Sequence, residues 1–153
     1  MSNSTLYFAY DASLDPEWMS AVSPGARFLF TAHYPETRLD FVQSGLGEPR
    51  PTLTRDPAHT VWGGVFEIPA AEVAALIKAT LEEGRVPGFD HKAVDREGNK
   101  YDCLTFVSNN SPNGGHRPTP DYLEAMIRGA RHWSLPAGWV MGLEELAEDP
   151  LLT

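Results

Sequence analysis

The chain has 153 residues, the size of one domain with a single core, and its 42% hydrophobic content excludes a largely disordered protein. Lysine and arginine total 12 against 21 aspartate and glutamate residues, which gives a formal net charge of −9. This acidic balance argues against nucleic acid or an anionic membrane as the main partner, because both attract basic surfaces. No apolar run approaches the roughly 20 residues that span a bilayer, and we expect no secretory signal.

The chain contains a single cysteine, Cys103. It cannot form an internal disulfide, which is typical of proteins from a reducing compartment, so we expect a cytoplasmic protein. Cys103 also falls inside a predicted strand, where a buried cysteine is usually an inert apolar residue rather than a nucleophile.

The first predicted elements alternate strands with a short helix. Residues 5–10 (TLYFAY) are rich in β-formers and predict a strand, followed by a turn at 11–14. Asp15-Pro16 is typical of a helix start, with aspartate as the N-cap and proline at the first helical position. Residues 26–34 and 38–43 predict two strands, or one strand bent near Pro35. The proline- and glycine-containing stretch 44–59 is predicted to be a loop.

The middle of the chain predicts a buried strand and an amphipathic helix. Residues 60–68 (TVWGGVFEI) predict the strand, and Gly63-Gly64 within it indicates a bulge or a close backbone approach. A helix is predicted from Pro69 to about Glu82, with Gly84 as its C-terminal stop. Its apolar stripe has helical spacing and comprises Val73, Leu76, Ile77 and Leu81.

The last third predicts a hairpin and two helices. These elements are a hairpin of residues 89–95 and 100–107 around Gly98, a polar loop at 108–118, a helix from Thr119-Pro120 to about His132, and a last helix at 137–147. Strands dominate the first two thirds and helices are too few for a doubly wound sheet. We therefore predict one α+β domain over residues 1–153, with a mixed, largely antiparallel sheet that curls toward a barrel and flanking helices.

Common catalytic motifs are absent from the sequence. It has no P-loop, no Gly-x-Gly-x-x-Gly dinucleotide loop and no Gly-x-Ser-x-Gly elbow. Five histidines are scattered at spacings that fit no standard zinc pattern: His33, His59, His91, His116 and His132. Carboxylates remain, and Glu82-Glu83-Gly84 lies at the end of a predicted helix. From spacing alone this pair is a general acid/base candidate if buried, and a solvated acidic pair if exposed, which is commoner.

Five segments, in order along the chain, share their pattern with one known family. Tyr7–Leu14 matches an opening strand and a Tyr-Gly-Ser-Asn-Leu loop, and Val61–Ile68 matches a Val-Trp-Gly-x-x-Tyr/Phe-x-Ile/Leu strand. Glu83-Gly84, with Gly88, matches a Glu-Gly-x-x-x-Gly segment, and Cys103 falls where many members have a strand cysteine. Residues 118–136 match a closing helix with Pro-Ser-x-x-Tyr, Gly-Ala and Gly-Leu-Pro. The chain thus resembles the γ-glutamylcyclotransferase-like proteins (AIG2-like and BtrG-like) over nearly its whole length.

The resemblance implies a small mixed β-barrel with flanking helices, and a lyase or acyl-transfer reaction. In that reaction the α-amine of a γ-glutamyl amide attacks its own side-chain carbonyl, so 5-oxoproline forms and an amine is released. Glu83 is implied as the general acid/base, and no cofactor or metal is needed. The implied partner is a small-molecule substrate, and a homodimer is compatible with the sequence. The implied substrate-binding residues, through backbone N–H groups of the first turn, are Tyr10, Asp11, Ala12, Ser13 and Leu14.

The loop Tyr10–Leu14 departs from the family pattern at Asp11, Ala12 and Ser13. A carboxylate at position 11 facing the pocket is expected to repel a substrate carboxylate and to favour a cationic amine. Asp90 and Phe106 also stand where tyrosines are common in the family. These departures leave a second hypothesis open, namely a non-catalytic or differently specific small-molecule binding domain on the same fold.

Two tryptophans, one histidine and one arginine allow both a structural and a ligand-binding interpretation. Trp62 and Trp133 are large aromatics that line pockets in some proteins, but in strands and amphipathic helices they are usually core. His116 and Arg117 lie in the polar loop, where they would either close over a ligand or remain solvated.

Overall fold

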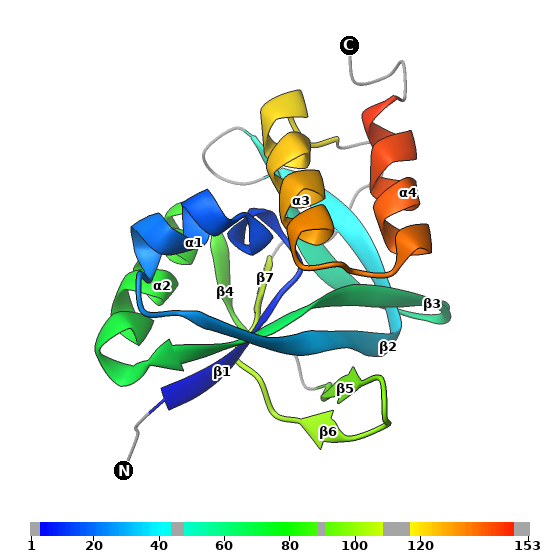
Figure 1. The fold of residues 1–153 in the computed structure, drawn as a ribbon. Coiled ribbons are helices and arrows are strands. Elements are labelled where there is room, and N and C mark those ends of the chain that lie inside the picture. The colour runs from blue at the N-terminus through cyan, green and yellow to red at the C-terminus, as the bar shows by residue number, and fades with distance from the viewer. Residues whose placement is uncertain (1–3, 44–47, 89–90, 109–116, 149–153) are drawn as a thin grey trace.

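The computed structural model describes residues 4–43, 48–88, 91–108 and 117–148. A five-stranded antiparallel sheet crosses the middle of the molecule in the order β1-β3-β2-β5-β6, and helices α1, α3 and α4 lie on one side of it (Figure 1). The strands of this sheet are β1 (Ser4–Ala9), β2 (Arg27–Gln43), β3 (Pro49–Pro69), β5 (Ala93–Asp95) and β6 (Lys100–Tyr101). A separate antiparallel pair consists of β4 (Arg85–Pro87) and β7 (Phe106–Ser108).

The edge of β1 that does not pair with β3 is joined by the chain just before β7. The Phe8 N–H donates to the Leu104 carbonyl at 2.9 Å, and the Leu104 N–H donates to the Leu6 carbonyl at 2.8 Å. The sheet therefore curls into a half-barrel, and the prediction of an α+β fold with a largely antiparallel, curled sheet is confirmed.

The second half of β1, Tyr7–Ala9, is buried on both faces, which explains why this part of the strand is apolar without alternation. Tyr7 and Ala9 face the core beneath the helices, whereas Phe8 and Tyr10 face a second cluster on the other side of the sheet. The alternation follows from the period of two residues along a strand. Residues 10–15, which follow β1, therefore start from a rigidly held strand end.

Gly63 allows β1 to lie close against β3. A Cβ atom added at Gly63 would stand 2.3 Å from the Ala9 carbonyl oxygen and 2.7 Å from the Phe8 ring. The close backbone approach expected at the paired glycines is thus confirmed.

The stretch 44–59 was predicted to be a loop, and this is wrong for residues 49–59, which belong to β3. This part of β3 pairs with β2, where Phe41 lies opposite Pro51. Pro51 is tolerated because its backbone faces away from β2: its carbonyl accepts a hydrogen bond from the Tyr10 hydroxyl. Residues 44–47 of the predicted loop lie outside the described residues.

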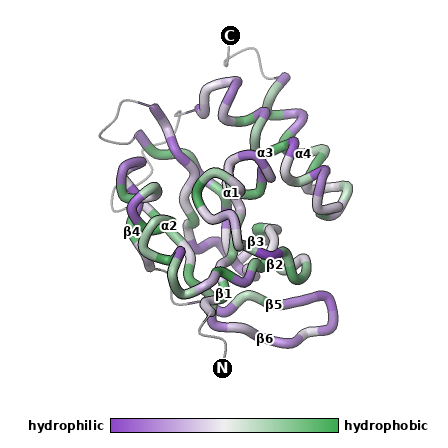
Figure 2. Tube along the Cα trace, turned by 60° about the vertical axis from the view of Figure 1, so that its left-hand side comes forward, coloured by the Kyte–Doolittle hydropathy of each residue, from purple (hydrophilic) through white to green (hydrophobic). Residues whose placement is uncertain are grey.

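Of the two alternatives for residues 26–43, the structure has one strand with an irregularity near Pro35. The register of β2 against β3 shifts between Pro35 and Thr37, and the intervening Glu36 has a φ of 53°. The predicted hairpin at 89–107 is shorter than expected, since β5 and β6 form it around Gly98 while Phe106–Ser108 leaves to pair with β4. This hairpin projects from the sheet and has a hydrophilic tip (Figure 2).

The helices follow the predicted boundaries closely. They are α1 (Pro16–Val22), α2 (Ala70–Glu82), α3 (Pro120–His132) and α4 (Ala137–Ala147), and a short 3-10 turn, η1, covers Ala12–Leu14. Asp15 caps α1 by accepting from the Glu17 N–H, and Thr119 caps α3 by accepting from the Tyr122 N–H. Leu76 is fully buried on α2, but Leu81 is 49% exposed and does not belong to its buried stripe. None of the helices in the described segments has the length and apolar character of a transmembrane span.

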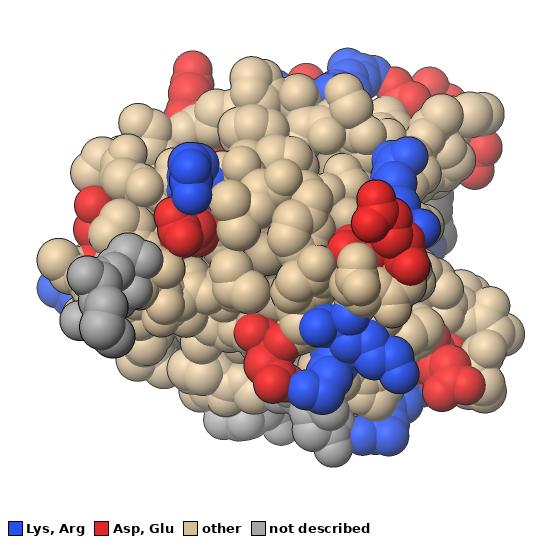
Figure 3. All heavy atoms as spheres, turned by 60° about the horizontal axis from the view of Figure 1, so that its bottom comes forward, with Lys and Arg blue, Asp and Glu red and all other residues tan. Residues whose placement is uncertain are grey.

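On the face shown in Figure 3, lysine and arginine side chains lie beside acidic ones rather than gathering into one basic patch. Arg27 of β2 and Glu67 of β3 form an ion pair on the surface, with Nη2 and Oε1 2.9 Å apart. Exposed pairs of this kind contribute little to stability, at most about 1 kcal/mol. Arg85 and Asp11, by contrast, form a buried ion pair beside the turn that follows β1.

Candidate active site

A cavity of about 460 Å³ opens where η1, α1, the start of β3, the end of α2 and the first turns of α3 meet. Its walls combine two aromatic side chains with acidic and basic groups. The lining residues are Ala12, Trp18, Glu48, Arg50, Glu83, Thr119, Asp121, Tyr122 and Ala125. A cavity with few polar groups converging on an aromatic wall is the usual form of a small-molecule site.

Glu83 reaches this cavity because of how α2 ends. It is the C-cap residue of α2, and Gly84 follows with a φ of 81°, a left-handed conformation that suits glycine and turns the chain into β4. The Glu83 side chain is only 13% exposed, whereas the neighbouring Glu82 lies on the surface. The structure thus separates the two adjacent acids: of this pair, only Glu83 lines the cavity.

Two arginines hold the Glu83 carboxylate. Arg85 Nη2 donates to Oε1 at 2.6 Å from the buried side, and Arg50 Nε donates to Oε2 at 3.3 Å from the cavity side. Both carboxylate oxygens are therefore engaged by cations, which fixes the orientation of the group.

Arg85 also forms a buried ion pair with Asp11, with Nη1 and Oδ2 2.6 Å apart. Both side chains are 2% exposed. Burial by itself raises the pKa of Asp11, but the Arg85 guanidinium and hydrogen bonds from Ser13 outweigh it and lower the pKa below its usual value. Asp11 is therefore ionised at neutral pH, and its charge is compensated from below the cavity.

Tyr7 of β1 and Tyr10, the residue directly after β1, support the turn from beneath. The hydroxyls of Tyr7 and Ser13 are 2.7 Å apart, and the Tyr10 hydroxyl donates to the Phe106 carbonyl at 2.6 Å. Burial raises the pKa of both tyrosines, so they remain protonated. Phe106 itself is 1% exposed and packs in the core.

The turn uses much of its own hydrogen-bonding capacity. The Ser13 N–H donates to Asp11 Oδ1 at 2.8 Å, and the Leu14 N–H donates to the Asp11 carbonyl at 3.1 Å. The Ala12 N–H makes only a long contact of 3.4 Å to the Tyr122 hydroxyl, and both residues line the cavity. Ala12 N–H is consequently the donor of the turn best placed to meet a ligand.

Helix α3 holds the turn in position from the opposite side. Trp133 Nε1 donates to the Leu14 carbonyl at 2.7 Å, and Arg128 pairs with Asp15 at 2.6 Å. A Cβ atom at Gly129 would lie 2.4 Å from the Leu14 carbonyl carbon, so only glycine allows this approach. Trp133 is thus an anchor for the turn rather than a cavity residue, and its ring stacks on Phe28.

The sequence-predicted site residues occupy two levels. Glu83 and Ala12 line the cavity. The other four members of the predicted binding loop lie beneath it, each 1–2% exposed: Tyr10, Asp11, Ser13 and Leu14. A preference for a cationic amine was expected only if the Asp11 carboxylate faced the pocket; this carboxylate does not line the cavity and is paired with Arg85. Asp90 and His116 lie outside the described residues.

Sequence reasoning missed Arg50, Arg85 and Tyr122 as members of the site. Tyr122 carried a signal, since it occupies the tyrosine of the closing-helix pattern. Arg85 follows Glu83 by two residues, but only a folded chain places its guanidinium against Asp11. Arg50 lies in a stretch predicted to be a loop, so nothing in the sequence connected it to Glu83. Among the described residues, no three His, Cys, Asp or Glu side chains group into a metal site.

The fold and the cavity define a small α+β domain with a half-barrel sheet and a glutamate, Glu83, that two arginines hold in a cavity beside the turn after β1. A solved γ-glutamyl cyclotransferase has this architecture: it superposes with a TM-score of 0.82 at 25% identity, covering 93% of this chain and 87% of that one. The AIG2-like family matches residues 60–143, and the chain belongs to this family.

Curated relatives agree with this assignment. A γ-glutamylcyclotransferase from Mus musculus is 27% identical over 138 residues, covering 86% of this chain and 72% of the relative. The Homo sapiens γ-glutamylcyclotransferase is 26% identical over 144 residues, covering 87% and 73%.

Proposed function

We propose that this chain releases an amine or amino acid from a γ-glutamyl amide and forms 5-oxoproline, with Glu83 as the general acid/base. The observation that carries the proposal is the position of Glu83, which lines a cavity of about 460 Å³ together with Ala12 of the turn after β1. The names of the relatives support the same reaction class.

The reaction needs one proton carrier and one oxyanion donor. The α-amino nitrogen of the γ-glutamyl group bonds to its own γ-carbonyl carbon, and Glu83 accepts the proton that the nitrogen loses. The carbon–nitrogen bond to the leaving amine then breaks, and Glu83 returns the proton to that amine. The Ala12 N–H, whose contact with Tyr122 is long, supplies a hydrogen bond to the transient oxyanion. Because the attack is intramolecular, the cavity mainly has to hold a folded conformer of the substrate.

The test is to incubate the protein with a panel of γ-glutamyl amides and to measure the released 5-oxoproline by chromatography. Glu83→Gln is expected to lower kcat at least 100-fold, since general acid/base groups typically contribute factors of 100 to 10,000. Glu82→Gln is the matched control, because it makes the same change one residue earlier on an exposed side chain. Equal loss in both variants, or none in Glu83→Gln, would remove Glu83 from the mechanism.

A second candidate function is binding of a small molecule without turnover. One observation favours it: both oxygens of the Glu83 carboxylate are already paired with arginines. On this alternative, γ-glutamyl amides bind to the wild type without any 5-oxoproline appearing. Calorimetric titration beside the product assay separates the two functions.

A further inference from the structure

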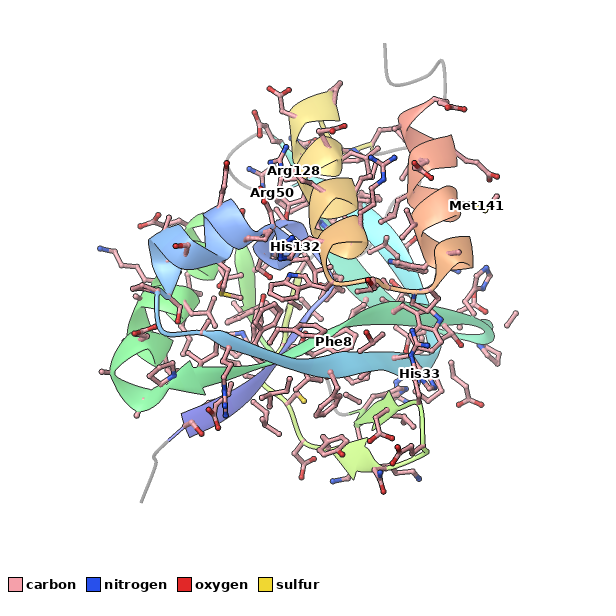
Figure 4. All side chains as sticks on the ribbon, viewed as in Figure 1. Phe8, His33, Arg50, Arg128, His132 and Met141 are labelled. Carbon is pink, nitrogen blue, oxygen red and sulfur yellow. The ribbon has the colours of Figure 1, made fainter. Side chains whose placement is uncertain are left out.

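Arg50 lines the same cavity as Glu83 and is the second residue of β3. Its guanidinium lies 4.5 Å above the centre of the Tyr122 ring, and its side chain is 16% exposed. In Figure 4 it lies close to α3, at the side that faces α1. Among the described residues that line the cavity, Arg50 is the only cation.

The present partners of Arg50 are ones that a ligand can replace. Nη1 pairs at 3.1 Å with Glu48, whose side chain is 55% exposed, and exposed ion pairs are weak because water competes for both charges. Nη1 also donates to the Pro49 carbonyl at 3.3 Å, a long contact with the neighbouring residue. Nε donates to Glu83 at 3.3 Å, but Arg85 holds the same carboxylate more closely, at 2.6 Å, from the buried side. Among the described residues, none bonds to Nη2 of Arg50. The guanidinium can therefore turn to a ligand while Glu83 stays in place.

The turn after β1, by contrast, has few donors to offer to a substrate carboxylate. The Asp11 side chain accepts a hydrogen bond from the Ser13 N–H, and the Asp11 carbonyl accepts one from the Leu14 N–H. Its own buried charge also lies at the base of the turn. A carboxylate ligand needs donors, and in this chain the cavity supplies them at Arg50 rather than at the turn.

We infer that Arg50 is the specificity-determining residue that binds the free α-carboxylate of the substrate, while Glu83 receives the adjacent α-amino group. The inference rests on the proposed function and deepens it: the substrates are γ-glutamyl amides with an unmodified α-carboxylate. An α-amino acid carries its cation and its anion on one carbon, which matches a glutamate and an arginine that lie side by side. The planar fork of arginine suits a carboxylate because it donates two parallel hydrogen bonds.

The first arm of the experiment changes the substrate and the enzyme together. γ-Glutamyl amides with an α-carboxylate and with an α-carboxamide are compared in the wild type and in Arg50→Met. The wild type is expected to prefer the carboxylate by roughly 10- to 100-fold in kcat/KM, the range for a hydrogen bond to a charged group. In Arg50→Met that preference falls below about threefold, mainly through KM, and Arg50→Lys restores part of it. Arg27→Met, an exposed arginine paired with Glu67, is the matched control and keeps the preference.

The second arm removes the competing carboxylate at the rim. Glu48→Gln leaves Arg50 with one partner fewer, so KM for the α-carboxylate substrate is expected to fall roughly two- to fivefold. A variant that merely damaged the fold would raise KM, so the direction of the change distinguishes recognition from damage. A rise in KM, or no change, contradicts the inference.

The third arm is independent of turnover and uses L-norleucine and L-norleucinamide, which carry the amino acid head without a scissile carbonyl. Chemical-shift titration is expected to show at least tenfold tighter binding of the acid, and no preference in Arg50→Met. 5-Oxoproline formation without these preferences refutes the role of Arg50 and leaves the proposed function standing. Preferential binding of the acid with no 5-oxoproline from any γ-glutamyl amide refutes the proposed function and leaves recognition by Arg50 standing.

Discussion

Replacing Arg85 with methionine tests how the site is supported from below. Methionine fills much of the same volume but leaves the Asp11 carboxylate, 2% exposed, without its cation. It also removes the 2.6 Å hydrogen bond that fixes Glu83. We expect Arg85→Met to lower both the stability of the fold and the catalytic rate.

The size of the stability loss follows from the burial of the pair. Removing one partner of a buried ion pair typically costs about 3–5 kcal/mol, because the remaining charge has lost its solvation and its partner. Ser13 still donates to Asp11, so we expect a value near the lower end, about 3 kcal/mol. With a urea m-value of about 2 kcal/mol per molar, that lowers the unfolding midpoint by roughly 1.5 M. The double variant Asp11→Asn with Arg85→Met should recover more than half of the loss, because position 11 then carries no buried charge and Glu83 keeps its contact with Arg50.

The pH dependence gives an independent check. In the wild type, the pKa of Asp11 is lower in the folded than in the unfolded chain, so the ionised carboxylate stabilises the fold at any pH above the ordinary pKa of 3.8. This contribution is lost as the pH falls through the folded-state pKa. In Arg85→Met the guanidinium no longer offsets burial, so we expect the pKa of Asp11 to rise above its wild-type value and protonation of Asp11 to relieve part of the loss. The difference in unfolding free energy between the two proteins should therefore shrink between pH 7 and about pH 4.

Tryptophan fluorescence during urea unfolding at several pH values measures both effects. The reasoning is refuted if Arg85→Met unfolds at the wild-type midpoint at pH 7, or if its deficit grows as the pH falls. It is also refuted if the double variant is no more stable than the single one, because the loss would then not come from an uncompensated Asp11.

Two further predictions concern the contact between α3 and the turn, and the cysteine. Gly129→Ala places a methyl group 2.4 Å from the Leu14 backbone, so it should lower the free energy of unfolding by about 1–3 kcal/mol and reduce kcat/KM. Gly142→Ala is the control: it has open space around it and should be neutral or slightly stabilising. Equal behaviour of the two variants in thermal melts and in the product assay would argue against α3 as the support of the turn. Burial, together with Asp102, raises the pKa of Cys103 to about 12, so at pH 8 this thiol should react with iodoacetamide far more slowly than a free thiol, with unchanged 5-oxoproline release. Rapid alkylation followed by mass spectrometry, or loss of activity on alkylation, would contradict this.

The local signals in the sequence determined the helices and most of the strands. Asp15 and Thr119 cap their helices as their position before a proline indicates, and Gly84 ends α2 in a left-handed conformation. These features depend on interactions between residues a few positions apart, so they can be inferred without knowing the fold. The resemblance to the γ-glutamylcyclotransferase-like family likewise came from motifs within short segments.

Only the tertiary structure decided which polar residues meet. Residues 49–59 form a strand because β2 supplies the partner, and this long-range pairing overrides the local signal of the prolines. The charge of Asp11 looked unfavourable in the sequence, but Arg85, distant along the chain, pairs with it in the folded protein. Arg50 reaches Glu83 for the same reason, since β3 and the end of α2 converge only after folding. Short sequence patterns reflect local conformational preferences. Whether a buried charge is compensated depends on contacts between distant residues, which form only when the chain folds.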